Sequence, residues 1–411
     1  MKWQEGLVVD ELRQGNWLTR ERVVVVSAVA GTASLLSLLW LFGFGHGTLD
    51  PVGRPLGTDF SQVYAAGQMV LDGHSADVWN WPKHFAVQQQ IHHSTRVDLY
   101  GWHYPPPFLL IATLLAPLPY LPALLVWQAA SLSAFTALMW KLVPRWETLL
   151  LVLAAPVTLI CVTHGHNGFL TAFLLGGGLL LLERKPLVAG LLLGCLIYKP
   201  QFALIIPPLL LITRSWRAIA GACVSAALLI ATTLLFWGWP VWQAFIDSLP
   251  LTRDVVLEQG RTGWYKIMSP FSAVRMWGGT IPAAYAVQSV FTAAAMAAVT
   301  FLSLRDNAKL RNAAVAASVI LATPYVLDYD FVVLGLGIAW LWLDGEDEGF
   351  LPWDRTLMAL VWISPLVARQ IAHFTYLPIG LATVLVMLAI PLRRSIVRAS
   401  PFRRSREAFA R

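Results

Sequence analysis

Charged residues are scarce in this chain of 411 residues, where Asp, Glu, Lys and Arg together make up 13% of the sequence. A typical soluble domain has about 25% charged residues. Hydrophobic residues make up 57% of the sequence instead. This composition excludes an ordinary soluble enzyme, a disordered chain and a nucleic-acid-binding module, so we expect no nucleic-acid partner.

Cysteine is scarce as well, and several common reaction motifs are absent. The three cysteines, Cys161, Cys195 and Cys223, all lie in apolar runs. This placement indicates buried thiols rather than a disulfide or a metal site. The sequence contains no G-x-S-x-G, no Walker A loop and no H-E-x-x-H, so hydrolase, ATPase and metalloprotease chemistry is not indicated.

Long apolar runs dominate what is present. We predict an all-α polytopic membrane protein in which residues 1–411 form one domain with about twelve transmembrane helices. Several runs are shorter than the roughly 20 residues that cross a bilayer, so neighbouring helices must shield them. The predicted spans are residues 23–44, 123–140, 149–162, 169–182, 187–198, 202–212, 218–237, 282–304, 313–326, 331–343, 356–372 and 376–392.

The distribution of basic residues predicts how these helices are oriented. If the proline-edged run 105–118 is re-entrant or in-plane, most Lys and Arg residues fall on one side, as expected of the cytoplasm. Both termini then lie in the cytoplasm, together with a basic tail at 393–411. The other side carries two long loops, 46–104 and 239–281, and all nine histidines. We therefore expect the functional site on the outer face of the cytoplasmic membrane.

The first outer loop contains a segment, residues 59–71, with the apolar spacing of an in-plane helix. Such a helix packs one face on the membrane or on the helix bundle. Asp59 opens this segment and Gln62 follows three residues later, which is typical of a helix N-cap in a capping box. Asp59 is also placed to take a proton from a hydroxyl group at the membrane surface, and the two roles are compatible.

Two polar positions lie between later apolar runs. Lys199 is interpreted either as a lysine that extends to the lipid headgroups or as a ligand for a phosphate. Asp328-Tyr329-Asp330 matches the D-x-D motif of metal-dependent transferases. It is a tight loop between two spans, so we expect a bare external turn or a polar contact to an acceptor. Neither close histidine pair has the spacing of a zinc site, and we expect no bound metal.

A series of short motifs carries a family resemblance. They are Thr58-Asp59-Phe60-x-x-x-Tyr64 after the first span, Tyr104-Pro105-Pro106, Gly165-His166-Asn167 before a later span, and Lys199-Pro200. In this order and spacing the chain resembles the C-type glycosyltransferase superfamily, and within it the polyprenol-phosphate-mannose-dependent α-(1→2)-mannosyltransferases of glycosyltransferase family 87. Two departures concern sugar and acceptor: the Gly–Asn element is shortened around His166, and the loop at 328–330 lacks an expected histidine.

The resemblance implies a C-type glycosyltransferase fold. It implies transfer of a hexose, mannose first among the candidates, from a polyprenyl-phosphate donor among the membrane lipids to a lipid or glycan acceptor, with inversion. It also implies Asp59 as the general base, without a cofactor or a metal. Lys199, Arg261 and Arg369 would bind the donor phosphate. The residues that would contact the sugar or the acceptor are Tyr64, His103, Tyr104, His166, Asn167, Asp328 and Asp330.

Two other classes of membrane protein stay open on sequence grounds. A lipid-linked glycan ligase or polymerase would share this architecture and differ in the size of its donor. A secondary transporter or flippase would also have about twelve spans, but it should carry charged residues within them. The predicted spans contain almost no charged residues, which favours a transferase.

Overall fold

The computed structural model of the chain describes residues 9–305 and 307–399, and every regular element in these ranges is a helix. Five helices in these ranges are long and apolar enough to cross a membrane. They are α2 (Arg20–Gly43), α6 (Tyr120–Leu142), α12 (Trp216–Trp237), α15 (Ile281–Ser303) and α20 (Ile379–Ala399). The prediction of an all-helical polytopic membrane protein is therefore confirmed.

Two predicted spans are broken in the middle. The run 149–162 forms α7 (Trp146–Leu153) and α8 (Pro156–His164), which are bent by 53°. The run 356–372 forms α18 (Asp354–Ile363) and α19 (Pro365–Thr375), which are bent by 71°. Each second helix starts at a proline, which fits the first helical turn. Ala155 before Pro156 is extended, as a residue before proline prefers, whereas Ser364 before Pro365 keeps helical backbone angles.

The other predicted runs are also helical but too short to cross alone. A helix of 14 residues, such as α9 or α16, spans about 21 Å, against about 30 Å of hydrocarbon. Five to seven spans are thus supported among the described residues, and the count of twelve is not confirmed. The short elements are α9 (Gly168–Leu181), α10 (Pro186–Gly194), η3 (Cys195–Tyr198), η4 (Pro200–Ile205), α11 (Ile206–Ile212), α16 (Ala308–Leu321) and α17 (Val332–Glu348).

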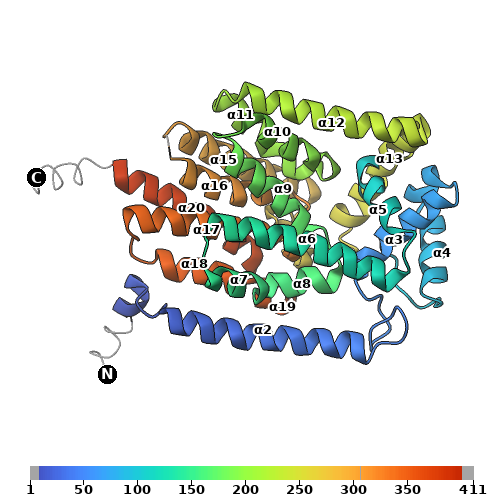
Figure 1. Cartoon of the computed structure of the whole chain (residues 1–411), viewed down its shortest axis with the longest axis horizontal. Coiled ribbons are helices and arrows are strands. Elements are labelled where there is room, and N and C mark those ends of the chain that lie inside the picture. Colours follow the sequence, from blue (N-terminus) through green and yellow to red (C-terminus); the bar gives the residue numbers. More distant parts are fainter. Residues whose placement is uncertain (1–8, 306, 400–411) are drawn as a thin grey trace, which may run out of the picture.

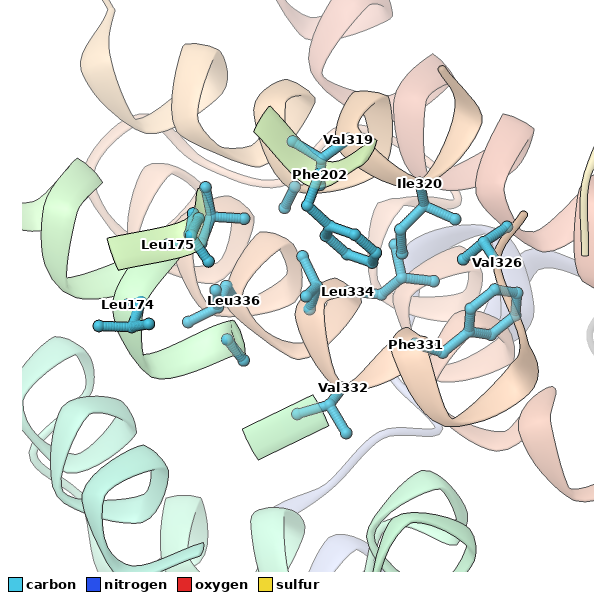
Figure 2. Packing of buried hydrophobic residues seen from close by; sticks show 14 of the residues in the cluster. Leu174, Leu175, Phe202, Val319, Ile320, Val326, Phe331, Val332, Leu334 and Leu336 are labelled. Atoms are coloured by element: carbon cyan, nitrogen blue, oxygen red, sulfur yellow. The ribbon is translucent and has the colours of Figure 1, made fainter. Parts of the chain in front are cut away.

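The short helices make the core of the bundle. Helix α16 is buried at every position from Leu310 to Leu321, so neighbouring helices shield it as the sequence requires. Side chains from η4, α9, α16 and α17 fill the centre, where Figure 2 shows Phe202 among Val319, Ile320 and Leu334.

The predicted in-plane helix is present as α3 (Thr58–Leu71), but it is not amphipathic in its packing. Almost every residue from Phe60 to Met69 is buried. Helix α5 (Leu109–Leu115) lies so close that a Cβ on Gly67 would meet the carbonyl oxygen of Ala112 at 2.2 Å. The helix packs on the bundle, as expected, but on more than one face, because α5 and α4 (Trp81–Ile91) cover it.

Both segments expected to be long outer loops are largely helical. The first also contains the single turn η1 (Ser75–Trp79) and ends before η2 (Pro106–Phe108), which with α5 forms the proline-edged run. This run is too short to cross, as expected of a re-entrant or in-plane segment. The second segment contains α13 (Trp239–Thr252), η5 (Arg253–Glu258), η6 (Trp264–Lys266) and α14 (Pro270–Met276).

Figure 1 places the start of α2 and the end of α20 at one end of the bundle, and α3, α4, α5 and α13 at the other end. This arrangement agrees with two long loops that lie opposite both ends of the described chain. Residues 1–8 and 400–411, which include most of the predicted basic tail, lie outside the described residues. The beginning of that tail continues α20 instead.

A set of buried ion pairs, here called the terminal network, lies where α20 ends. Arg394 is 1% exposed and donates from Nε to Asp344 Oδ2 at 2.6 Å, and it also pairs with Asp354. Arg398 donates to Asp344 at 2.7 Å, and Arg393 donates to Asp354 at 2.6 Å. These arginines were expected only to orient the chain in the membrane, whereas they join α20 to α17 and α18.

Candidate active site

Asp59 lies in the first turn of α3 but does not cap it. The N-cap is Gly57, whose φ is 70°, so the N-cap interpretation of Asp59 is wrong. Gly165 ends α8 with a φ of 64°, and a Cβ there would lie 2.6 Å from Phe60 Cβ and 3.2 Å from Gly57 Cα. Only glycine permits this approach. It brings the start of α3 against the turn that begins at His164.

The Asp59 carboxylate has a raised pKa and a buried oxygen without a hydrogen-bond partner among the described residues. Its Oδ2 is buried and has no hydrogen-bond partner within the described part of the chain. Burial raises the pKa of Asp59, while the charges of His164 and Arg369 and the hydroxyl of Tyr329 act in the opposite direction. A carboxylate with a raised pKa is a stronger base than an ordinary aspartate, which suits proton removal near neutral pH.

The D-x-D turn is η7 (Asp328–Phe331), and it is not a bare external turn. Asp328 is 2% exposed and accepts a hydrogen bond from Arg369 Nη2 at 2.7 Å. Asp330 is 3% exposed and accepts one from Lys199 Nζ at 2.5 Å. The expectation of an exposed turn is therefore wrong, because a cation from another element neutralises each carboxylate.

Lys199 is neither free nor directed to the lipid headgroups. It is 4% exposed, and Nζ also donates to Asn167 Oδ1 at 3.2 Å. The ammonium lies 4.6 Å from the centre of the Phe202 ring. A phosphate that bound Lys199 would have to compete with Asp330, so the geometry argues against the phosphate-binding role implied by the family resemblance.

His166 and Tyr104 line the same region as the D-x-D turn. The His166 ring stacks on Tyr329 with ring centres 3.6 Å apart and planes 24° apart. The Tyr104 hydroxyl lies 3.5 Å from His166 Nε2. Burial holds the pKa of His166 well below its usual value, so this imidazole is neutral at physiological pH. Its Nδ1, like Asn167 Nδ2, has no partner among the described residues.

His103 lies beside this group rather than in it. Its Nδ1 is 3.2 Å from Thr252 Oγ1, and its ring centre is 6.3 Å from that of Tyr325. Burial lowers the pKa of His103 to about 4. The structure therefore offers a neutral, partly exposed imidazole at the edge of the site.

Two of the expected site residues lie elsewhere. The Tyr64 hydroxyl donates to the Leu118 carbonyl oxygen at 2.7 Å, and the ring packs edge-on against Tyr120. This contact joins α3 to the turn after α5. Arg261 is exposed, and its Nε donates to Gln259 Oε1 at 3.1 Å. Within the described ranges, no hydrogen bond or ion pair joins either side chain to Asp59 or to η7.

Sequence reasoning missed two cations, Lys266 and Arg54. Burial and the charges of Arg369 and Arg54 lower the pKa of Lys266, whereas the charges of Asp328 and Asp59 raise it. Lys266 therefore lies within electrostatic reach of Arg369, Arg54 and Asp59, and Asp59 lies within reach of Arg369. No local signal marks them: Lys266 follows two aromatic residues in a short helical turn, and Arg54 lies in a polar turn before α3.

His164 was also missed as a neighbour of Asp59. Its Nδ1 lies 2.8 Å from the carbonyl oxygen of Ile160, and because a carbonyl only accepts, Nδ1 carries the hydrogen. Its ring meets Tyr329 edge-on at 5.6 Å. The residue was noted in the sequence only as half of an unsuitable zinc pair.

The described residues thus form a helical bundle with helices of membrane-spanning length, in which a buried carboxylate lies near cationic side chains. The model of glycosyltransferase family 87 matches residues 102–327, which is more than half of the chain. The chain therefore belongs to glycosyltransferase family 87 and is a membrane glycosyltransferase.

The match includes His103, Tyr104, His166, Asn167 and Lys199, whereas Asp59, η7 and α19 lie outside the matched range. Comparisons with curated proteins and with solved structures return no match. The C-type glycosyltransferase fold and the roles of individual residues therefore stay predictions.

Proposed function

We propose that this glycosyltransferase moves a hexose, with mannose as the first candidate, from a polyprenyl-phosphate donor to a lipid or glycan acceptor. We place the reaction on the outer face of the cytoplasmic membrane and assign it inversion at the anomeric carbon. The observation that carries the proposal is the buried, unpartnered Oδ2 of Asp59 near the cations Lys266 and Arg369, with Arg54 near Lys266. A base and an anion-binding group are what such a transfer requires.

Asp59 acts as the general base in this reaction. It takes the proton of the acceptor hydroxyl as the oxygen bonds to the anomeric carbon from the side opposite the phosphate. The bond between that carbon and the phosphate oxygen breaks, and the electron pair leaves with the polyprenyl phosphate. Because the phosphate leaves as an anion, no second carboxylic acid is needed to protonate it.

The departing phosphate is held by Arg369, Lys266 and Arg54. Arg369 uses Nη2 for Asp328, while its Nε is buried without a partner among the described residues. That N–H is therefore a donor that a phosphate oxygen can use. Lys266 is partly buried, which strengthens its attraction to an anion relative to a fully solvated lysine. These assignments replace Lys199 and Arg261 as the main phosphate ligands.

The sugar is bound by the polar and aromatic side chains between Asp59 and η7. Asn167 Nδ2 and His166 Nδ1 are buried without partners in the described ranges, so they can pair with sugar hydroxyls. Tyr104 and His103 present an aromatic edge to the same region. Asp328 and Asp330 each accept a hydrogen bond from a cationic side chain. Their other lone pairs can accept hydrogen bonds from sugar hydroxyls.

The reaction is tested with purified protein in liposomes and a panel of polyprenyl-phosphate hexoses. The expected result is transfer from one of these donors to a lipid or glycan acceptor, with the product anomer opposite to that of the donor by NMR. Transfer from a nucleotide sugar in the absence of any lipid donor would contradict the proposal. Retention of the anomeric configuration would contradict the single-displacement mechanism.

The side of the membrane is tested with two exposed positions at opposite ends of the bundle. His74 follows α3, and Glu348 ends α17. In a chain without its three native cysteines, His74→Cys should react with a membrane-impermeant reagent in intact cells, and Glu348→Cys should react only after permeabilisation. The reverse pattern would place the site in the cytoplasm.

A further inference from the structure

Side chains from three positions at or between helix ends meet at the ammonium group of Lys199. Lys199 lies between η3 and η4, Asn167 lies directly before α9, and Asp330 lies in η7. Nζ of Lys199 donates to the other two side chains at 3.2 Å and 2.5 Å, respectively. Lys199 and Asp330 are both at least 96% buried. Two of the three donors of this ammonium are thus used inside the protein.

Asp330 links Lys199 to the backbone of the D-x-D turn. Its Oδ1 accepts from Lys199, and its Oδ2 accepts from the backbone N–H of Leu327 at 3.1 Å. On the other side of the turn, Asp328 is held by Arg369 at 2.7 Å. The residue between the two carboxylates, Tyr329, is therefore anchored from both sides.

Tyr329 is the part of the turn that faces the proposed base. Its ring stacks on His166 at 3.6 Å, and its hydroxyl lowers the pKa of Asp59. A displacement of η7 would alter both contacts at once. A misplacement of about 1 Å in an active site can cost roughly 10²-fold in rate, so the anchor of Tyr329 matters to the reaction.

We propose that Lys199 and Asp330 are a positioning pair, which holds Tyr329, stacked on His166, beside Asp59 and acts on the reaction through η7 rather than by binding the donor phosphate. This inference rests on the proposed function of Asp59. A buried ion pair suits such a role because either charge alone would be costly to bury, so the two groups keep a single arrangement. The phosphate is left to Arg369, Lys266 and Arg54.

Kinetics of three variants test the pair. They are Lys199→Met, the double variant Lys199→Met with Asp330→Asn, and the control Lys83→Met, whose lysine is exposed and pairs with the surface residue Asp77. We expect Lys199→Met to lower kcat by about tenfold or more, with KM for the donor within about twofold. In the double variant no buried charge is left alone, so the protein should fold, but η7 still lacks its contact to Lys199 and kcat should stay about tenfold or more below the wild type. Lys83→Met should match the wild type.

The pH profile separates positioning from a general loss of structure. The side chains that act on the pKa of Asp59 are Tyr329, His164 and Arg369, which lower it, and Asp328, which raises it. If Tyr329 moves away while the Arg369–Asp328 pair keeps its place, the pKa of Asp59 rises further, and the acidic limb of kcat/KM moves to higher pH in Lys199→Met. A merely structural defect would lower the amount of active enzyme and leave this limb in place. An unmoved limb would therefore overturn the inference.

Other outcomes decide against the pair as well. A rise of about tenfold in KM for the donor, with kcat near the wild-type value, would return Lys199 to the phosphate site. If Lys199→Met fails to fold, the double variant carries the test, and a folded double variant with the wild-type kcat would overturn the inference. The rate is measured on whichever sugar is transferred. An active Asp59→Asn variant would instead refute the proposed function, so the two failures are distinguishable.

Discussion

Buried charges are arranged in opposite ways at the two ends of this bundle (Figure 1). In the terminal network, Arg394 is 1% exposed and lies between Asp344 and Asp354, and neighbouring arginines complete the pairing. At the other end, Asp59 has a buried oxygen with no partner in the described part of the chain. Cations lie near Asp59, but the hydrogen bond that Arg369 makes goes to Asp328.

This difference distinguishes charged residues that stabilise the fold from charged residues that take part in the proposed reaction. A fully paired buried network keeps its own groups occupied and has nothing left for a ligand. An unpartnered buried carboxylate costs free energy in the folded state, and such costs persist at sites where a substrate supplies the missing partner. The comparison predicts that substitutions at one end change the chemistry and that substitutions at the other end change stability.

Asp59→Asn should have the largest effect on the reaction. The amide has nearly the same volume but cannot take a proton, so kcat should fall by about 10²–10⁴-fold. Asp72→Asn is the matched control, because Asp72 is exposed at the other end of α3. It should stay fully active. Activity of Asp59→Asn within a few fold of the wild type would end the assignment, and Asp50 or Asp98 would become the next candidates.

The same substitution should leave the fold intact. Because folding raises the pKa of Asp59, its charged form destabilises the protein above that pKa, and wild-type stability increases as the pH falls through it. Asn removes this cost, and α3 keeps its cap at Gly57. The variant should be at least as stable as the wild type at neutral pH. The acidic limb of the wild-type pH profile should lie above the ordinary aspartate pKa of 3.8.

Arg394→Met should have the next largest effect, and it should fall on stability. The substitution leaves two buried carboxylates with fewer partners, so the free energy of unfolding in detergent should fall by about 3 kcal/mol or more. Arg20→Met is the control, because the Arg20–Glu147 pair is largely exposed at its arginine, and such pairs contribute about 0–1 kcal/mol. The activity per folded Arg394→Met molecule should be unchanged. Equal losses in both variants would contradict the comparison.

The sequence predicted the helices better than it predicted the contacts between them. All twelve apolar runs are helical because composition alone marks them, and even the breaks before Pro156 and Pro365 have a local signal. Asp59 was singled out because it opens the apolar segment 59–71 and because the family resemblance implies a base there. Lys199 was assigned to a phosphate because its partner, Asp330, lies 131 residues further along the chain. Such a pairing depends on the tertiary fold.

The two missed cations, Arg54 and Lys266, have the same explanation. They and Arg369 belong to three segments that are far apart in the sequence, and only packing brings Lys266 near Arg54, Arg369 and Asp59. Each of them alone is an ordinary basic residue near a helix end. A site made of basic residues from distant segments therefore leaves no recognisable motif in a single sequence.

Lys266→Met should have a moderate effect on KM for the donor, and it tests which cations near Asp59 bind the donor phosphate. Loss of one cation near the departing phosphate should raise KM for the donor by about tenfold, which corresponds to one charge-assisted hydrogen bond. Arg261→Met should have a smaller effect, because Arg261 is exposed and contacts Gln259. Donor titrations of both variants decide the order. A larger effect at Arg261 would restore the assignment that the family resemblance implies.

Removal of divalent metal should have the smallest effect. Asp328 and Asp330 are the groups that a D-x-D metal site would use, and each already accepts a hydrogen bond from a cationic side chain, Arg369 or Lys199. A divalent ion would have to displace both cations, at the cost of leaving two charges buried without partners. Transfer measured after treatment with EDTA should stay within about twofold of the untreated rate, since the proposed chemistry draws its positive charge from side chains. Loss of activity that Mn²⁺ or Mg²⁺ restores would show that the two carboxylates exchange their cations for a metal, and η7 would then belong with the reactive charges rather than with the paired ones.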